Sequence, residues 1–191
     1  MLKICSKMKE LVVLGLGSNK AFEQKNKRLL SGIELLEEAC RDLSTFIQEM
    51  KVSSVWKSAP MYVENQDFFY NMVVSGYYDG TPQKLLKKIN AVEARWGRNR
   101  KKEFRNGPRT LDIDIEFYGE RILKTEKLTI PHERITERAF VVFPLLEILP
   151  DSADKVTGES FAAIAKRLSD QNVVRFGEVD YGRRNIDINS R

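Results

Sequence analysis

The stretch of sequence that decides the fold runs Gly107-Pro108-Arg109-Thr110-Leu111-Asp112-Ile113-Asp114-Ile115-Glu116-Phe117-Tyr118. Apolar and polar residues alternate from Leu111 onward, as they do in a half-buried β-strand, where successive side chains point to opposite faces. The three apolar positions, Leu111, Ile113 and Ile115, therefore share one face. The acidic positions, Asp112, Asp114 and Glu116, share the other, so the stretch predicts a strand with an acidic surface on one side of a sheet.

Other segments carry the patterns of strands and helices. In chain order we expect a strand at 11–16, a helix from about Gln24 to Cys40, a strand at 46–57 with an irregularity around Lys51, a strand at 68–78, a helix at 81–95 and, beyond the acidic strand at 111–118, a short helix at 161–168. Thr81 and Pro82 mark a helix start, as N-cap and first helical residue. This order predicts an α+β, ferredoxin-like βαββαβ fold with an antiparallel sheet, helices on one face and C-terminal additions.

The bulk composition fits one soluble domain. The chain has 191 residues, of which 42% are hydrophobic, so we expect a single domain over 1–191 with a flexible tail at 181–191. The formal net charge of +5 favours an anionic partner, either nucleic acid or a phosphorylated small molecule. Only two cysteines are present, no secretory signal is evident, and the longest apolar run, 139–149, is too short to span a membrane. These features favour the cytoplasm and no membrane partner.

The acidic face of the strand suggests metal chemistry. Asp112 and Asp114 lie two residues apart, which on a strand is roughly 6.5–7 Å. Two carboxylates at that spacing can flank a pair of Mg²⁺ ions whose coordination is completed by polyphosphate oxygens. The alternative is an amphipathic strand with a solvated acidic face, and for an isolated Asp-x-Asp that is the commoner outcome.

The segment before the strand, Arg95 to Arg109, is densely cationic. Guanidinium groups bind phosphate oxygens bidentately and stabilise charge that develops in phosphoryl transfer. Turns at Gly97 and Gly107 would let the middle of the segment move as a lid. A solvated basic loop is the second interpretation, and a nucleic-acid contact with Trp96 and Phe104 as stacking residues is the third. Composition alone favours none of the three.

Three other features are ambiguous. His132 is the only histidine of the chain, and a lone histidine is more often a packing residue than a catalytic one. Gly15-x-Gly17-Ser18-Asn19 lacks the lysine of a P-loop and the third glycine of a dinucleotide fingerprint, so we interpret it as a turn that ends a strand. Asn71 follows three aromatic residues, which favours a core position over recognition of a flat heterocycle.

Taken together, the motifs resemble those of the hydroxymethyldihydropterin pyrophosphokinase family. The resemblance covers roughly residues 11 to 165 and rests on five runs in family order: Gly15-Leu16-Gly17-Ser18-Asn19, Val52-Ser53-Ser54, Gly97-Arg98-x-Arg100, Gly107-Pro108-Arg109-Thr110-Leu111-Asp112-Ile113-Asp114 and Ile130-Pro131-His132. It implies a ferredoxin-like enzyme of folate biosynthesis. Such an enzyme transfers pyrophosphate from ATP to the hydroxymethyl group of a reduced pterin and releases AMP.

The resemblance also implies roles for individual residues. Asp112 and Asp114 would hold two Mg²⁺ ions, and the catalytic set would be these two with Arg98 and Arg109. The residues expected at ATP are Glu93, Arg98, Arg100, Arg109, His132 and Arg138. The pterin would lie between Phe69 and Phe140, against Asn71, with Ser58, Pro60 and Met61 lining its pocket. The implied partners are therefore small molecules, ATP and the pterin, with no nucleic acid, and we expect a monomer.

Three positions depart from the family pattern. Phe69 stands where tyrosine is frequent, Asn106 replaces a tryptophan of the loop, and Glu133 stands where an aromatic residue is common. The change to Asn106 could affect how the loop closes over a ligand. Two competing hypotheses remain: a basic nucleic-acid-binding module or two-metal nuclease that uses the same aspartates, and an inactive relative that serves as an interaction module.

Overall fold

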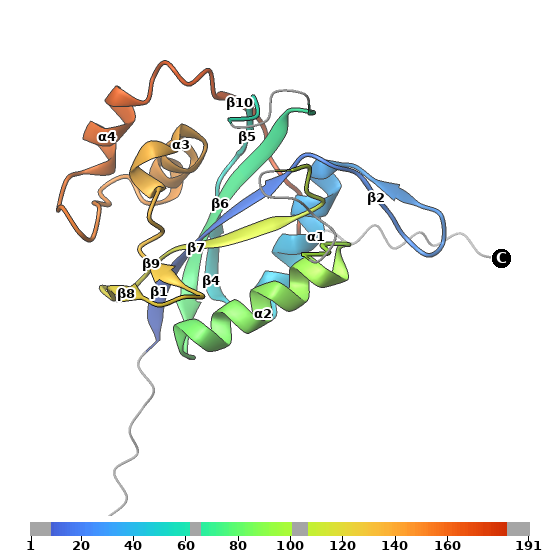
Figure 1. Ribbon diagram of the computed structural model, residues 1–191, viewed down its shortest axis with the longest axis horizontal. Coiled ribbons are helices and arrows are strands. Elements are labelled where there is room, and N and C mark those ends of the chain that lie inside the picture. The colour runs from blue at the N-terminus through green and yellow to red at the C-terminus, as the bar shows by residue number, and fades with distance from the viewer. Residues whose placement is uncertain (1–8, 62–65, 101–106, 183–191) are drawn as a thin grey trace, which may run out of the picture.

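The computed structural model describes residues 9–61, 66–100 and 107–182 (Figure 1). The main sheet is antiparallel and has the strand order β10-β5-β6-β1-β7, with β4 also paired to β6. Its strands are β1 (Glu10–Ser18), β4 (Gln48–Val52), β5 (Val55–Ser58), β6 (Phe69–Tyr78), β7 (Asp112–Tyr118) and β10 (Val174–Gly177). The α+β class with an antiparallel sheet is therefore confirmed.

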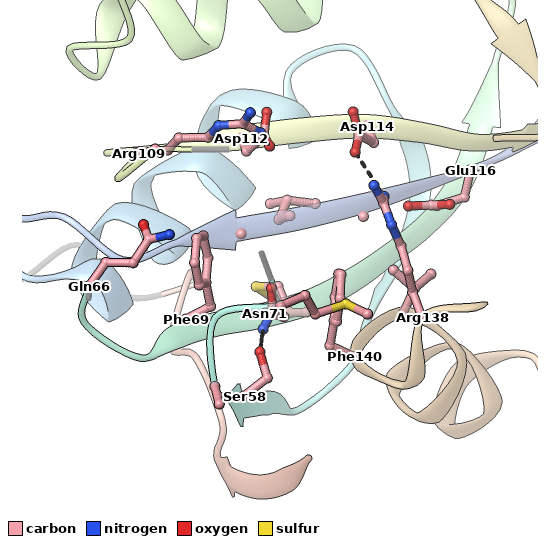
Figure 2. A pocket seen from close by; sticks show the side chains of 18 residues that line it. Ser58, Gln66, Phe69, Asn71, Arg109, Asp112, Asp114, Glu116, Arg138 and Phe140 are labelled. Atoms are coloured by element: carbon pink, nitrogen blue, oxygen red, sulfur yellow. Dashed lines mark hydrogen bonds and ion pairs between the residues drawn. The ribbon is translucent and has the colours of Figure 1, made fainter. Parts of the chain in front are cut away.

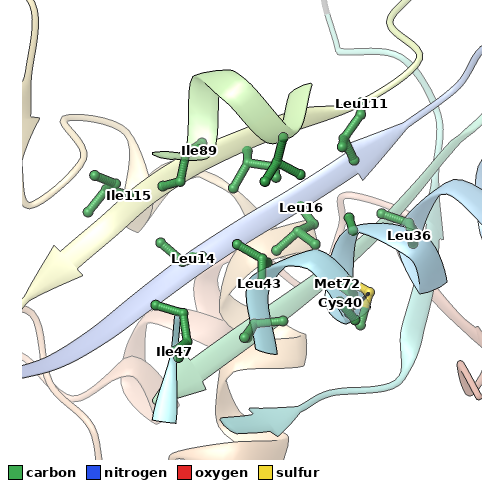
Figure 3. Packing of buried hydrophobic residues seen from close by; sticks show 14 of the residues in the cluster. Leu14, Leu16, Leu36, Cys40, Leu43, Ile47, Met72, Ile89, Leu111 and Ile115 are labelled. Atoms are coloured by element: carbon green, nitrogen blue, oxygen red, sulfur yellow. Dashed lines mark hydrogen bonds between the residues drawn. The ribbon is translucent and has the colours of Figure 1, made fainter. Parts of the chain in front are cut away.

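Two pairs of helices cover the two faces of this sheet (Figure 1). On one face, α1 (Gly32–Ser44) and α2 (Pro82–Arg95) pack on a core that includes Leu14 of β1. Figure 3 shows side chains of this core from all three elements, among them Leu14, Leu36 and Ile89. On the other face, α3 (Ala139–Ile148) and α4 (Phe161–Arg167) pack on Val13 and neighbouring sheet residues. The expectation of helices on one face holds for α1 and α2, whereas the C-terminal helices lie opposite.

The first helix begins later than the sequence pattern predicts. The Oγ of Ser31 accepts from the backbone N–H of Glu34, and the Glu34 carboxylate accepts from the N–H of Ser31 in return. This capping box starts α1 at Gly32. The expected helix is therefore wrong for residues 24–31, where a small hairpin of β2 (Phe22–Glu23) and β3 (Leu29–Leu30) forms instead. The second helix starts as predicted, because Thr81 accepts from the N–H of Lys84 and Pro82 follows it.

The expected strand at 46–57 is two strands. Its irregularity near Lys51 is confirmed by a register shift against β6 between Gln48 and Lys51. The break itself falls at Ser53-Ser54, where the Oγ of Ser53 accepts from the backbone N–H of Val73. β5 then continues along β6 as far as Ser58, which brings Ser58 opposite Phe69.

The acidic strand contains a β-bulge. Leu14 of β1 faces Ile115 and Val13 faces Phe117, so Glu116 has no partner on β1. The predicted alternation holds up to Glu116 and is reset there: Phe117 joins the core under α3 and α4, and Tyr118 joins the opposite one. The bulge therefore changes the faces of the residues that follow it, whereas Glu116 keeps the face of Asp112 and Asp114.

The C-terminal part adds elements that the sequence pattern missed. The apolar run at 139–149 forms α3, preceded by the 3₁₀ turn η1 (Ile135–Glu137) and the hairpin of β8 (Leu123–Lys124) and β9 (Thr129–Ile130). The helix expected at 161–168 is present as α4, capped by Ser160. Tyr181 packs against the core, and the rest of the expected tail, 183–191, lies outside the described residues. Over the part of the chain that the structure describes, no helix is long and apolar enough to cross a membrane.

The corrected start of α1 yields a first prediction. Leu36 is fully buried and Leu29 is 64% exposed, although a helix from Gln24 would bury both on one face. Leu36→Ala should lower the free energy of unfolding by about 2–5 kcal/mol, because it leaves a cavity. Leu29→Ala should change it by less than about 0.5 kcal/mol. Urea unfolding of the two variants measures the difference, and equal losses would contradict the fold at this hairpin.

Candidate active site

One pocket gathers most of the residues that the sequence singles out. It opens where β1, β6 and β7 lie beside the start of α3 (Figure 2). Of the predicted site residues, those that line it are Ser58, Met61, Phe69, Asn71, Arg109, Asp112, Asp114, Arg138 and Phe140. Those outside its lining are Pro60, Glu93, Arg98, Arg100 and His132. The lining divides into a charged wall from β7 and a flatter wall from β5, β6 and α3.

The floor between the two walls belongs to β1. Gly17 pairs with Asn71 on β6 and with Asp112 on β7, so it separates an amide from a carboxylate by a single strand. A Cβ on Gly17 would come within 3.2 Å of the Asn71 Oδ1, and one on Gly15 within 2.5 Å of a Glu116 oxygen. The prediction that this Gly-x-Gly ends the strand is therefore wrong. Both glycines lie within β1, where the lack of side chains keeps the pocket open.

Two arginines converge on Asp112. Arg98 donates to its Oδ1 at 2.6 Å, and Arg109 donates to its Oδ2. Burial alone would raise the pKa of Asp112, but the charges of Arg109 and Arg98 outweigh it and hold the pKa below the usual range. Asp112 is therefore an anion at neutral pH, as a metal ligand or a partner of a cation must be.

Asp114 has a different pair of neighbours. An Nη of Arg138 donates to its Oδ2 at 3.3 Å, and the Nε2 of His132 lies 3.8 Å from the same atom. Burial lowers the pKa of His132, although the Asp114 charge opposes it, so the ring is neutral at pH 7. The His132 Nδ1 accepts from the N–H of Arg134, which leaves the ring proton on Nε2, facing Asp114.

Glu116 is a pocket residue that the sequence analysis missed, since it was grouped with a solvated acidic face. Its side chain is buried, with the residue only 1% exposed, and neither carboxyl oxygen has a hydrogen-bond partner among the described residues. Burial raises its pKa to about 8, the Asp114 charge adds to the rise, and Arg138 opposes it. Two features of the sequence could have pointed to Glu116: it is a third acid on the face of Asp112 and Asp114, and the neighbouring strand β1 contains Gly15 and Gly17.

A buried acid behind the charged wall ties the basic segment to β7. Glu93 of α2 accepts from the backbone N–H of Ile113 at 3.0 Å and from Arg100 at 2.5 Å. Arg98, 6% exposed, also donates to the carbonyl of Leu111 at 2.9 Å. These contacts fix the start of β7. They direct Arg98 toward the protein, so its expected phosphate contact stays a prediction, as do those of Arg100 and His132.

The opposite wall is flat and carries an amide. The Nδ2 of Asn71 donates to the Ser58 Oγ at 3.0 Å, and the amide is buried yet lines the pocket. Phe69 and Phe140 lie on either side of Asn71 (Figure 2). Asn71 is therefore buried, as its aromatic neighbours favoured, and it also lines the pocket, while its recognition of a heterocycle stays a prediction.

Gln66 is a further lining residue that the sequence did not suggest. Its Oε1 accepts from the Asn19 Nδ2 at 3.1 Å, and the Asn19 Oδ1 accepts from the backbone N–H of Arg109 at 2.7 Å. One asparagine thus links the segment at the aromatic wall to the arginine loop at the charged wall. The periodicity of apolar residues in the sequence gives no indication of such a long-range hydrogen-bonded link.

The basic segment does not present Trp96 to a ligand. This side chain is buried, packs edge-on against Phe22 with ring centroids 6.4 Å apart, and donates from Nε1 to Asp42 at 2.9 Å. The alternative in which it stacks on a nucleic acid is therefore wrong for Trp96. Residues 101–106, which include Phe104 and Asn106, lie outside the described residues, and Glu133 is exposed.

The donor set of the charged wall fits Mg²⁺. Asp112 and Asp114 offer carboxylate oxygens, which this ion prefers. In the described ranges, no group of three or more His, Cys, Asp or Glu side chains is arranged to hold a metal by itself. Two carboxylates suit an ion that is shared with the phosphates of a substrate.

Comparisons with known proteins agree with this geometry. A sequence model of the 7,8-dihydro-6-hydroxymethylpterin-pyrophosphokinase (HPPK) family matches residues 13–150. The 2-amino-4-hydroxy-6-hydroxymethyldihydropteridine pyrophosphokinase of Aquifex aeolicus is 41% identical over 140 residues, which cover 73% of this chain and 81% of that protein. The folic acid synthesis protein fol1 of Pneumocystis carinii is 35% identical over 182 residues, 95% of this chain and 23% of that protein.

Solved structures show the same fold. The wild-type HPPK-DHPS of Plasmodium falciparum superposes with a TM-score of 0.62 at 14% identity, covering 84% of this chain and 45% of that one. The chain thus spans under half the length of the longer relatives, and most of the pyrophosphokinase of A. aeolicus. On the match over residues 13–150 and the identity to that enzyme, the chain belongs to the 7,8-dihydro-6-hydroxymethylpterin-pyrophosphokinase family.

Proposed function

We propose that this protein transfers the pyrophosphoryl group of ATP to the hydroxymethyl group of 6-hydroxymethyl-7,8-dihydropterin, releasing AMP, as a step of folate biosynthesis. The observation that carries the proposal is the double pairing of Gly17 with Asp112 and Asn71. Through it, a wall suited to a metal–triphosphate and a wall suited to a flat heterocycle face one pocket across two glycines of β1, Gly15 and Gly17. A transfer between two bound substrates needs this adjacency.

The flat wall would bind the pterin. Phe69 and Phe140 flank the position of the ring, which lets aromatic stacking supply affinity. The Asn71 amide, oriented by its hydrogen bond to Ser58, would read the edge of the ring. Ser58 and Met61 line the same wall, with Pro60 nearby in the chain, and Gln66 adds a second amide.

The charged wall would bind the triphosphate. Arg109 and Arg138 line the pocket and each holds an aspartate, so both guanidinium groups can pass to phosphate oxygens when ATP arrives. Glu93, Arg98, Arg100 and His132 complete the proposed ATP set, with Glu93 and Arg98 acting through the position of β7. Neutral His132 would donate from Nε2. The reaction then depends on positioning and neutralisation of charge rather than on a strong base.

Asp112 and Asp114 would hold two Mg²⁺ ions together with the ATP phosphates. When bound, the ions supply neutralisation of the charge on the transferring group. The carboxylates suit this role because arginines keep Asp112 ionised and Asp114 is 40% exposed at the side chain.

We also propose a fold assignment and a domain organisation for this chain. The order β5-β6-β1-β7 within the sheet supports assignment to the ferredoxin-like, split-βαβ arrangement. We also propose that residues 1–191 form a single pyrophosphokinase domain. The monomeric state, the cytoplasmic location and the lack of nucleic-acid partners stay predictions.

Product analysis tests the reaction. The purified protein should form AMP, and no ADP, from MgATP only when fresh hydroxymethyldihydropterin is present. Asp112→Ala and Asp114→Ala should each lower kcat by roughly 10²- to 10³-fold, because a metal-binding charge worth several kcal/mol is lost. Asp170→Ala, a change at an exposed aspartate outside the pocket lining, is the matched control and should leave kcat unchanged. Formation of no AMP by the unaltered protein would overturn the proposal.

A second test concerns the flat wall. Phe140→Ala should raise KM for the pterin about 10- to 100-fold, the size expected when one stacking contact is removed. Phe143→Ala is the matched control on the same helix, since Phe143 packs on Trp56 with centroids 5.6 Å apart and does not line the pocket. Steady-state kinetics at saturating MgATP separates the two variants. An unchanged KM for Phe140→Ala would contradict the pterin position.

A further inference from the structure

Glu116 has no role in the site as described so far, although the fold makes two local adjustments around it. The β-bulge of β7 falls at this residue, which has no partner on β1 and lines the pocket. Gly15 of β1 leaves the space for the carboxyl, because a Cβ there would meet a Glu116 oxygen at 2.5 Å. Both adjustments accommodate a buried carboxyl whose oxygens have no hydrogen-bond partner in the described chain. Such a group lowers stability, so a compensating role is expected.

Arg138 is the cationic neighbour of this carboxyl. Figure 2 shows the Glu116 carboxyl directed toward the guanidinium group of Arg138, which lies between it and Asp114. The guanidinium bonds Asp114 through Nη1 at 3.3 Å, a long contact. Its Nε is buried and has no hydrogen-bond partner within the described ranges. A donor without an acceptor and an acceptor without a donor thus face the same side of the pocket, and no hydrogen bond or ion pair joins them in the described chain.

A cation bound at Asp114 would compete with Arg138 for the carboxylate oxygens, and the contact to Arg138 is already long. The Asp114 side chain is 40% exposed, whereas that of Arg138 is only 15% exposed, so the arginine cannot turn to water instead. His132, the other neighbour of Asp114, offers Arg138 no acceptor, because its Nδ1 already accepts from the N–H of Arg134. Asp112 is already engaged by Arg98 and Arg109.

We propose that Glu116 is a positioning residue for Arg138, and that it accepts from the arginine when Asp114 is given over to the metal–nucleotide, so that the guanidinium stays directed at the phosphates. This inference rests on the proposed function. Glu116 makes no contact with the substrate in this proposal. Glu116 affects nucleotide binding only by orienting Arg138.

The test compares Glu116→Met and Glu116→Gln with the unaltered protein in two measurements. Calorimetry with a non-hydrolysable ATP analogue and Mg²⁺ gives the affinity, and thermal unfolding without ligand gives Tm. Glu116→Met should weaken binding about 10-fold, as expected for loss of one hydrogen bond to a charged group. It should also raise Tm by roughly 2–4 °C, because an unpartnered buried carboxyl is replaced by an apolar chain. Glu116→Gln, whose amide oxygen still accepts, should bind with intermediate affinity.

A double-mutant cycle with Arg138→Ala shows whether Glu116 acts through the arginine. In the Arg138→Ala background, Glu116→Met should cause no further loss of affinity. Additive losses, or unchanged affinity of Glu116→Met in the otherwise unaltered protein, would overturn the inference while the proposed function stands. If the unaltered protein neither binds the analogue nor forms AMP, the proposed function fails, and this inference fails with it.

Discussion

The ion pairs between the β7 aspartates and their arginines are the constraint on which the site depends. Arg98 follows α2, Arg109 lies just before β7 and Arg138 lies at the start of α3, so three segments converge on one strand. Carboxylates in a partly buried wall need such partners, since removing one leaves an uncompensated charge. The same pairs set the ionisation of the wall: Asp112 keeps a lowered pKa despite burial, whereas the unpaired Glu116 has a raised one.

These pairs also satisfy the carboxylates of the site that we propose binds a highly charged ligand. Each aspartate expected to bind Mg²⁺ is occupied by an arginine, and two of those arginines, Arg109 and Arg138, line the pocket. When a metal–triphosphate binds, the carboxylates would contact the metal and the guanidinium groups would contact the phosphates. Each charged side chain would thus keep a partner of opposite charge. The glycines of β1 keep the path to the Asn71 wall open, so the proposed exchange would take place beside the proposed acceptor substrate.

The sequence predicted the features that local chemistry controls. The alternation of β7 up to Glu116 and the capped start of α2 at Thr81 are examples. The gathering of Asp112, Asp114, Arg109 and Arg138 around one pocket was expected from the family resemblance instead. The sequence failed where long-range pairing decides. The bulge depends on register against β1, and the burial of Trp96 depends on Asp42 of another helix. Gly15 and Gly17 looked like a turn, because the reason for a glycine at each position is a side chain on a neighbouring strand, Glu116 of β7 and Asn71 of β6. The start of α1 was missed for a local reason: the Ser31–Glu34 capping box outweighed an apolar periodicity that continues upstream.

The most direct test of this account is a crystal structure with Mg²⁺, a non-hydrolysable ATP analogue and hydroxymethyldihydropterin bound together. Exchange of partners predicts that Arg109 and Arg138 leave Asp112 and Asp114 for phosphate oxygens, that both aspartates contact metal, and that Arg98 keeps its bonds to Asp112 and the Leu111 carbonyl. The pterin should lie between Phe69 and Phe140 with its edge on Asn71. A complex in which Arg109 and Arg138 remain on the aspartates, with the phosphates held elsewhere, would contradict it.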